Sequence, residues 1–266
     1  MICFPNAKIN IGLFVTGKRD DGFHNIETLF YPIPLCDVLE IFPSEKLSIF
    51  QSGSMTPSEP EDNLVVKAYR EMQKIYDFPP VSIFLRKAIP SGAGLGGGSS
   101  DAAFMLKSIN QLYNLEASDG ALEKIGEKIG ADCPFFIQNK PVFASGKGNI
   151  FTPSDLSLKG YTLYIVKPPV EVSTKEAYAM IKPMESSFNL NQLSHVPVSE
   201  WRNVLKNDFE AIVFDKYPVI KEIKDVLYKN GAEYAAMSGS GSAVYGIFEN
   251  TISPHFPTCF VWKGIF

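Results

Sequence analysis

The feature that most constrains this chain is a glycine-rich segment that runs directly into a helical pattern. Residues 91–103 read SGAGLGGGSSDAA, and apolar side chains then recur at helical spacing at Leu106, Ile109 and Tyr113. A backbone without side chains at a helix start can surround an anion with its N–H groups, and the helix dipole favours negative charge there. A ligand-free glycine turn and a flexible linker are the alternatives, and the ordered patterns on both sides disfavour the linker.

Two known nucleotide-binding motifs fit this segment less well. Gly92, Gly94 and Gly97 have the G-x-G-x-x-G spacing, but the dinucleotide fold that uses it requires a strand after the first helix. Here a second helix is expected from residues 118–119 onward. A Walker A loop requires a lysine before its final Ser or Thr, and none follows Lys87 in the segment. The sequence therefore favours phosphate binding by backbone amides at a helix start.

Composition excludes several other classes of protein. The chain has 266 residues and is 45% hydrophobic, which predicts a folded globular protein. A formal net charge of −4 without a block of Lys or Arg argues against nucleic acid as a partner. No stretch approaches the roughly 20 apolar residues of a membrane span, and no secretory leader is expected. The four cysteines are scattered, which predicts neither a zinc site nor a disulfide framework and favours the reducing cytoplasm.

Periodicity predicts an α+β fold in which strands and helices segregate instead of alternating strictly. Expected strands cover 9–15, 27–33, 38–42, 46–50, 81–85, 161–166, 234–237 and 243–248. Expected helices cover 63–76, 102–113, 118–129, 174–181 and 217–229. The loop-like stretch 152–160 predicts a division into an N-terminal lobe (1–155) and a C-terminal lobe (156–266). The last segment, from residue 249 onward, is short and carries Pro254 and Pro257, and no element is assigned to it.

Five stretches together resemble a known enzyme family. PSGAGLGGGSSDAA resembles the P-x-x-x-G-L-G-[GS]-S-S-x-A-A motif of the GHMP small-molecule kinases, named for galactokinase, homoserine kinase, mevalonate kinase and phosphomevalonate kinase. NAKINIGLFVTGKRDDGFHNIETLF, EDNLV, GADCPFF and MSGSGSAVYGIF resemble the branch of that family that phosphorylates 4-diphosphocytidyl-2-C-methyl-D-erythritol, in the same order and approximate spacing. The likeness extends from Ala7 to about Phe248.

This resemblance implies a two-lobe GHMP kinase fold with the active-site cleft between the lobes. It implies ATP as the phosphoryl donor together with Mg²⁺, for which Ser100 is the candidate ligand. Asn63 has a sufficient explanation as a helix cap, and a nucleotide contact is secondary for it. The residues expected to bind ATP are Pro90, Gly92, Gly94, Leu95, Gly96, Gly97, Gly98, Ser99, Ser100 and Asn63.

The same resemblance implies residues that bind a cytidine diphosphate-linked small molecule. His24 matches the position that hydrogen-bonds cytosine, and Phe23 stands where the family commonly has Tyr, so a ring face remains and a hydroxyl is lost. Tyr178 aligns with an aromatic residue on the other side of the base, and a core-facing helix residue is the alternative. The expected substrate-binding residues are Asn10, Phe23, His24, Tyr178, Gly239, Ser240 and Gly241.

Lys8 and Asp132 are the expected catalytic residues. By themselves, Lys8 would be a solvated charge on the polar face of a strand, and Asp132 would be a turn or capping residue. The resemblance implies instead that Asp132 receives or orients the substrate hydroxyl proton and that Lys8 lies beside it. The alternatives are a related kinase for homoserine or mevalonate and a non-catalytic nucleotide-binding protein, and the oligomeric state is expected to be monomer or homodimer.

Overall fold

The computed structural model describes residues 1–54, 60–250 and 254–266. The described residues form two compact units that interleave along the chain. Unit 1 consists of Met1–Ala7, Leu35–Ser91 and Gly96–Lys140, and unit 2 consists of Lys8–Pro34, Gly92–Leu95 and Pro141–Phe266. The single boundary at 155/156 falls inside unit 2, and the lobe ranges 1–155 and 156–266 stay a prediction.

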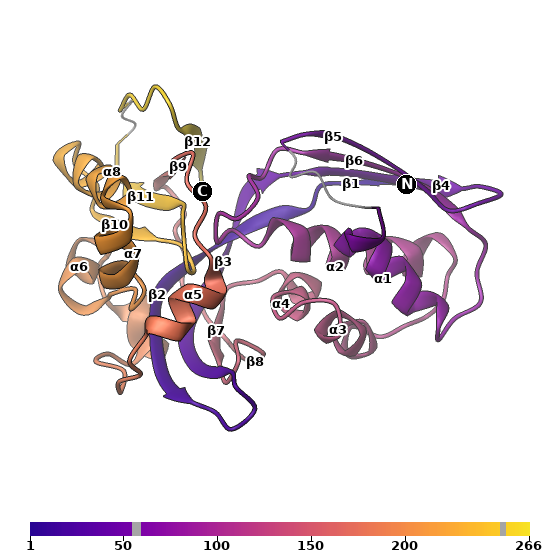
Figure 1. Cartoon of the computed structure of the whole chain (residues 1–266), viewed down its shortest axis with the longest axis horizontal. Coiled ribbons are helices and arrows are strands. Elements are labelled where there is room, and N and C mark those ends of the chain that lie inside the picture. The colour runs from indigo at the N-terminus through magenta and orange to yellow at the C-terminus, as the bar shows by residue number, and fades with distance from the viewer. Residues whose placement is uncertain (55–59, 251–253) are drawn as a thin grey trace. The chain divides into compact units, whose positions relative to one another are not determined.

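Unit 1 is a four-stranded sheet with helices on one face (Figure 1). The strand order is β1(Ile2–Cys3), β4(Val38–Pro43), β6(Val81–Lys87), β5(Ser48–Gly53). Only β5 runs parallel to its neighbour, β6; the other pairs are antiparallel. In β4 and β6 the residues that alternate toward the helices, such as Leu39, Ile41 and Ile83, are almost fully buried, as a sheet covered on one face requires.

The helices of unit 1 start and end where the sequence supplies caps. They are α1(Leu64–Gln73), α2(Gly97–Leu112), α3(Asp119–Glu127) and α4(Cys133–Gln138), preceded by the short 3₁₀ turn η1(Pro60–Asp62). The side chains of Asn63 and Ser118 accept hydrogen bonds from the first turns of α1 and α3. α2 begins after Gly96, whose positive φ of 72° suits a residue without Cβ.

Unit 2 contains two four-stranded sheets. The first has the order β2(Asn6–Lys18), β3(His24–Cys36), β7(Val142–Ser145), β8(Ile150–Pro153), and the first two residues of β2 belong to unit 1. The second has the order β10(Tyr234–Met237), β11(Val244–Phe248), β9(Thr162–Lys167), β12(Phe260–Ile265), with every pair antiparallel.

Unit 2 also contains helices, and the longest of them, α8(Pro218–Lys229), packs on β10 and β11 of the second sheet (Figure 1). The others are α5(Thr174–Met180), α6(Trp201–Val204) and α7(Glu210–Lys216), with 3₁₀ turns η2(Leu190–His195) and η3(Val198–Glu200). α8 buries Ile220, Ile223 and Leu227, which lie on one helix face because they are three and four residues apart. They join a core cluster with Val244 and Phe248 of β11.

The predicted α+β class is confirmed, and the long elements lie where periodicity places them. The sequence analysis missed short elements: α4, α6 and α7, the 3₁₀ turns, the two-residue strand β1, the four-residue strands β7 and β8, and β12. β12 begins three residues after Pro257, in a segment to which the sequence analysis assigns no element. Among the described helices, none combines the length and apolar character needed to cross a bilayer.

Candidate functional site

The first half of the glycine-rich segment, Gly92–Leu95, is held through all four of its carbonyl groups within unit 2. The carbonyls of Gly92 and Ala93 accept hydrogen bonds from the N–H groups of Ser242 and Ala243 at 3.3 and 3.2 Å. The Gly94 carbonyl accepts from the Ser238 hydroxyl at 2.9 Å. The carbonyl of Leu95 accepts from the Lys8 N–H at 3.0 Å. Because the carbonyl edge is fixed by protein, the path of this backbone is set without a ligand.

Gly94 occupies a position where only glycine fits. Its φ is +73°, and a Cβ built there would lie 2.0 Å from the carbonyl oxygen of Ser238. Gly239 also lies close to Gly94. A Cβ added at Gly239 would be 3.3 Å from the Gly94 Cα and 3.5 Å from the Asn10 Oδ1. The glycine-rich segment and the turn at 238–242 therefore pass each other at backbone contact.

The second half of the segment, Gly96–Ser100, forms the start of α2 in unit 1. At this end of the helix, the Ser100 N–H donates to the Gly96 carbonyl at 2.9 Å. The N–H groups of Gly97, Gly98 and Ser99 precede it and have no acceptor inside the helix. Gly98 is exposed, and Gly97 and Ser99 are half-buried, so these amides can meet a ligand from solvent. Such an end favours a phosphate group.

The two serines that end this segment differ. The Ser100 side chain is fully buried, and its hydroxyl has no hydrogen-bond partner among the described residues. Ser99 is half-buried, and its hydroxyl lies close to Gly130. A Cβ added at Gly130 would be 3.2 Å from the Ser99 Oγ. An orphaned hydroxyl at Ser100 fits a residue whose partner is a bound ligand or cation, although covering atoms would have to move to admit it.

Lys8 and Asn10 lie side by side on β2 and are both buried, with 4% and 3% of their surface exposed. The Lys8 ammonium donates to the Asn10 Oδ1 at 2.6 Å and lies 4.9 Å from the centre of the Phe30 ring. The Asn10 amide donates to the Thr28 hydroxyl at 3.0 Å, and that hydroxyl donates to the Gly12 carbonyl at 2.6 Å. The solvated-charge interpretation of Lys8 is therefore wrong in this structure: the ammonium is a desolvated cation held by a chain of hydrogen bonds.

Asp132 stands at the start of α4 in unit 1 and does not cap that helix through its side chain. Cys133, the next residue, is fully buried, and burial raises the pKa of its thiol to about 12, with the Ser99 hydroxyl opposing this shift and the Asp132 charge adding to it. The thiol therefore stays protonated and is no nucleophile at neutral pH. Ser99 and Cys133 bring the start of α2 next to the turn that carries Asp132.

Behind the start of α2 lies a buried cluster of charges. The Lys87 ammonium donates to carboxylate oxygens of both Asp37 and Asp101, with side chains 10%, 0% and 3% exposed, respectively. Asp37 also accepts from the N–H groups of Ala88 and Ile89 at 2.6 and 2.8 Å. A Cβ at Gly97 would lie 3.4 Å from the Lys87 ammonium. The cluster thus connects β6 and the residue just before β4 with the first turns of α2, and sequence analysis did not find it.

Two acidic side chains share one ammonium here, and the pKa values of Asp101 and Lys87 are shifted as a result. Burial raises the pKa of the Asp101 carboxyl to about 8; the Lys87 charge lowers it and the Asp37 charge raises it further. Burial alone would lower the pKa of Lys87, but the Asp101 and Asp37 carboxylates outweigh it and raise that pKa above its ordinary value. Lys87 is therefore a permanently charged residue.

The predicted substrate-binding aromatics lie in unit 2. The rings of His24 and Tyr178 are in direct contact, with centroids 5.2 Å apart and planes inclined by 33°. A base stacked between two rings needs about 7 Å, twice the usual carbon contact, so the two rings would have to separate to hold one. Tyr178 also meets Phe209 edge-on at 4.8 Å, which gives it the core contact of the alternative interpretation. Phe23 is 59% exposed.

The turn at 238–242, which joins β10 to β11, is tied down by side chains. The Asn207 amide donates to the carbonyls of Met237 and Gly239, both at 2.8 Å. The Ser240 hydroxyl is 2.8 Å from that of Thr174, and Gly241 has a φ of +96°. The Ser238 hydroxyl, besides its bond to Gly94, accepts from the N–H of Asn10 at 3.3 Å. This turn therefore contacts both β2 and the glycine-rich segment.

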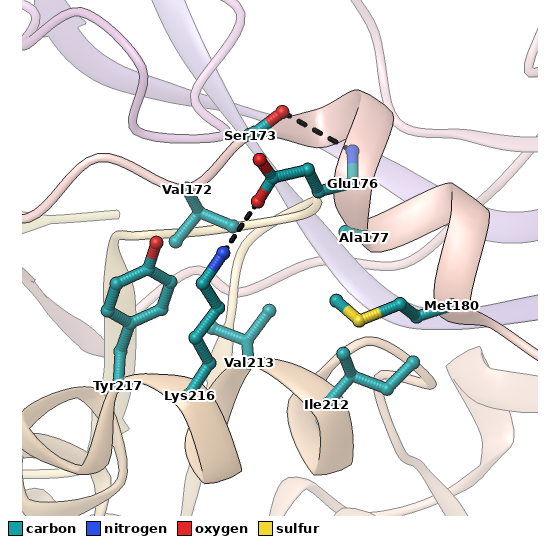
Figure 2. Close-up of a pocket in the computed structure, with 9 residues that line it drawn as sticks. All are labelled: Val172, Ser173, Glu176, Ala177, Met180, Ile212, Val213, Lys216 and Tyr217. Carbon is teal, nitrogen blue, oxygen red and sulfur yellow. Dashed lines mark hydrogen bonds and ion pairs between the residues drawn. The ribbon is translucent and has the colours of Figure 1, made fainter.

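A separate small hollow lies between α5 and α7, and Figure 2 shows it. An exposed ion pair between Lys216 and Glu176, 2.6 Å apart, spans it, and the Ser173 hydroxyl caps α5. None of the predicted site residues lines it: its walls are Val172, Ser173, Glu176, Ala177, Met180, Ile212, Val213, Lys216 and Tyr217. The hollow is therefore no part of the candidate site.

Comparisons with known proteins connect these features. Residues 63–140 match the family model described as GHMP kinases N terminal domain, and residues 191–254 match GHMP kinases C terminal. The chain is 55% identical over 268 residues to a 4-diphosphocytidyl-2-C-methyl-D-erythritol kinase of Parabacteroides distasonis, covering 99% of both chains. The chain belongs to the GHMP kinase family. This kinase therefore uses ATP as its phosphoryl donor, and its acceptor is a small molecule.

Solved structures agree with this assignment. A 4-(cytidine 5'-diphospho)-2C-methyl-D-erythritol kinase matches this GHMP kinase with a TM-score of 0.78 and 30% identity over 93% of this chain and 90% of that one. A homoserine kinase from Cytophaga hutchinsonii matches with a TM-score of 0.61 and 19% identity, covering 90% of this chain and 85% of that one. The second likeness shows the shared fold alone.

Within unit 2, the structure brings together five residues of the predicted set: Lys8, Asn10, Gly94, Leu95 and Gly239. Asn63 is occupied as the cap of α1, where it accepts from the Val65 N–H at 2.8 Å. Ser238, Asn207 and Lys87 were missed. Of these, only Ser238 had a sequence signal, because it lies in the stretch MSGSGSAVYGIF.

Proposed function

We propose that this GHMP kinase transfers the γ-phosphoryl group of ATP to a hydroxyl of 4-diphosphocytidyl-2-C-methyl-D-erythritol, a step in isoprenoid precursor biosynthesis. The observation that carries the proposal is the 55% identity over 99% of both chains to a kinase named for that substrate. The homoserine and mevalonate alternatives rest on likenesses of 14–19% identity, which concern the fold only.

The roles of individual residues are part of the proposal. The amides of Gly96–Ser99 bind ATP phosphates, because they are accessible and sit at the positive end of α2. Asp132 orients the substrate hydroxyl and takes its proton, which leaves the oxygen able to attack the γ-phosphorus. Lys8 places its desolvated charge on the phosphoryl oxygens, where charge accumulates during transfer.

Asn10 supports this chemistry by holding Lys8. Its Oδ1 accepts from the ammonium and its amide donates to Thr28, so Lys8 has one favoured orientation. His24 and Phe23 recognise the cytosine, and Tyr178 covers it after its ring moves away from His24. Gly239, Ser240 and Gly241 give the substrate close access to backbone.

Mg²⁺ would accompany ATP. The described residues contain no cluster of three or more His, Cys, Asp or Glu that would form an all-protein cage, as suits an ion held mainly by phosphate oxygens and water. The orphaned Ser100 hydroxyl is the residue that would complete its ligands. Bound there, the ion supplies charge neutralisation at the phosphates.

A coupled assay of ADP release tests the function across a panel of alcohols: the cytidine compound, homoserine and mevalonate. We expect turnover with the cytidine compound and at most traces with the others. Lys8→Met and Asp132→Asn should each fold normally and lose roughly 10²-fold or more in kcat. The matched control is Lys206→Met, which replaces a half-buried lysine whose ion pair with Asp208 lies outside the proposed catalytic set. Preference for homoserine or mevalonate would overturn the substrate assignment, and full activity of either variant would remove that residue.

The proposal extends to the compartment, the partners and the oligomeric state. The four free cysteines support the cytoplasm as the compartment. The net charge of −4 supports the absence of a nucleic-acid partner, and membrane association is likewise not expected. The oligomeric state is proposed to be monomer or homodimer, which sedimentation velocity would measure.

A further inference from the structure

Ser238 holds a position that none of the roles above uses. Its side chain is fully buried at the end of β10, directly before the glycines of the turn. Its hydroxyl donates to the Gly94 carbonyl at 2.9 Å and accepts from the Asn10 N–H at 3.3 Å. One hydroxyl has one proton to give and lone pairs to accept with, so both bonds form at the same time.

These two bonds make Ser238 a bridge in a ladder between β2 and the glycine-rich segment. The N–H groups of Lys8 and Asn10 are two residues apart on β2 and point to the same side. The first reaches the Leu95 carbonyl directly at 3.0 Å. The second reaches the neighbouring Gly94 carbonyl through the Ser238 hydroxyl. The ladder thus has one direct rung and one rung that passes through a side chain.

We infer that Ser238 is a positioning residue for phosphoryl transfer, because its hydroxyl sets the register between the strand that carries Lys8 and Asn10 and the glycine segment that leads into the phosphate-binding amides. This inference rests on the proposed function. Phosphoryl transfer depends on placement more than on covalent chemistry, so a shift of this register lowers kcat while ATP still binds.

Ser242 provides a matched control in the same turn. It is also fully buried, and its hydroxyl also donates to a backbone carbonyl, that of Val170 at 2.6 Å. Its side chain contacts neither β2 nor the glycine-rich segment through any hydrogen bond that the structure describes. Ser238→Ala and Ser242→Ala therefore remove the same chemical group at equal burial, and only the first cuts the ladder.

Steady-state kinetics separate positioning from folding. We expect Ser238→Ala to lower kcat by about 10- to 100-fold with KM for ATP changed by no more than about threefold. Ser242→Ala should keep kcat within about twofold while its melting temperature falls about as much as that of Ser238→Ala. Ser238→Cys, which retains a weaker donor and acceptor, should recover part of the loss. Equal kcat losses in both alanine variants, or an unchanged kcat in Ser238→Ala, would overturn the inference.

Amide hydrogen exchange on the ligand-free protein tests the ladder independently of any substrate. Peptides covering residues 8–12 and 92–96 should exchange faster in Ser238→Ala than in the parent and in Ser242→Ala. Unchanged exchange there would refute the bridge even in an active enzyme. If the parent fails on the cytidine compound, the proposed function fails, and the Ser238 kinetics are then measured with whichever alcohol of the panel is phosphorylated. If none is, the exchange result alone decides the bridge.

Discussion

The two halves of the glycine-rich segment are held by different physical means. Gly92–Leu95, in unit 2, is fixed by four neutral hydrogen bonds to its carbonyls from β2 and from the residues of and beside the turn at 238–242. Gly96–Ser100, in unit 1, starts a helix whose next residue, Asp101, belongs to a buried cluster with Lys87 and Asp37. Neutral bonds are individually weak and insensitive to pH, whereas a buried cluster of charges depends on the cation that compensates its carboxylates.

The first half of the segment should therefore tolerate the loss of one interaction better than the second half. Loss of one neutral bond leaves three others on the same four residues, so the first half can adjust. Loss of Lys87 from the charge cluster leaves the buried Asp37 carboxylate without a compensating cation, where solvent cannot reach it. We therefore expect substitutions in unit 1 to act on stability and substitutions in unit 2 to act on geometry.

Lys87→Met should give the largest effect on stability. It leaves the buried Asp37 carboxylate, and the Asp101 carboxyl group beside it, without their cation, which costs about 3–5 kcal/mol of unfolding free energy in comparable cases. Urea unfolding measures it. The control is Lys221→Met, which removes a lysine paired with Asp225 at the surface and should cost less than about 0.5 kcal/mol. A cost below about 1 kcal/mol for Lys87→Met would show that the cluster is not the anchor of this half.

Asp101→Asn should change how stability depends on pH. The carboxyl has an ordinary pKa of 3.8 and a folded-state pKa raised to about 8, so between those values the folded protein keeps a proton that the unfolded chain releases. The group's contribution to stability is thus complete below pH 3.8 and declines as pH rises toward 8, by up to about 1.4 kcal/mol per pH unit. Asparagine cannot titrate, so the stability difference, variant minus parent, should grow between pH 5 and 7.5.

Urea unfolding midpoints of parent and variant, measured at several pH values with a metal chelator present and no nucleotide, test this dependence of the stability difference on pH. Parallel pH profiles for parent and variant would mean that Asp101 is ionised throughout and that Lys87 neutralises both carboxylates.

Tyr245→Phe should have the smallest of the three effects. The Tyr245 hydroxyl donates to the Asn10 carbonyl at 2.9 Å inside unit 2, and loss of one buried neutral bond costs about 1 kcal/mol. Tyr234→Phe is the matched control, because its hydroxyl is buried without a hydrogen-bond partner among the described residues, and its removal should be neutral or stabilising. Equal costs for the two variants, measured by thermal unfolding, would contradict the hydrogen-bond assignment.

Sequence reasoning succeeded where local pattern carries the information. The glycine-rich segment and the long helices were placed by residue spacing and caps, such as Asn63 and Ser118. It failed where neighbours distant in sequence decide the outcome. Alternation along β2 assigned Lys8 to a solvated face of the strand. In the structure residues 6–15 of β2 are all buried, so neither face of the strand is solvated there.

The positioning residues were missed for the same reason. The cluster of Asp37, Lys87 and Asp101 joins residues 50 and 14 positions apart, and no periodicity predicts such a meeting. Ser238 lies 144 residues from the carbonyl that it binds. In both cases the side-chain types are ordinary, and only tertiary contact makes them functional.

The interleaving of the units has a consequence for synthesis on the ribosome. Every piece of unit 1 has been made once residue 140 has emerged, whereas Lys8–Pro34 of unit 2 must wait for strands that come last, including β11 at Val244–Phe248. At about 5–20 residues per second, that wait spans several seconds or more. Until those strands are synthesised, the apolar face of β2 lacks the residues that bury it in the folded protein. A chaperone that binds this face should therefore raise the yield of active enzyme.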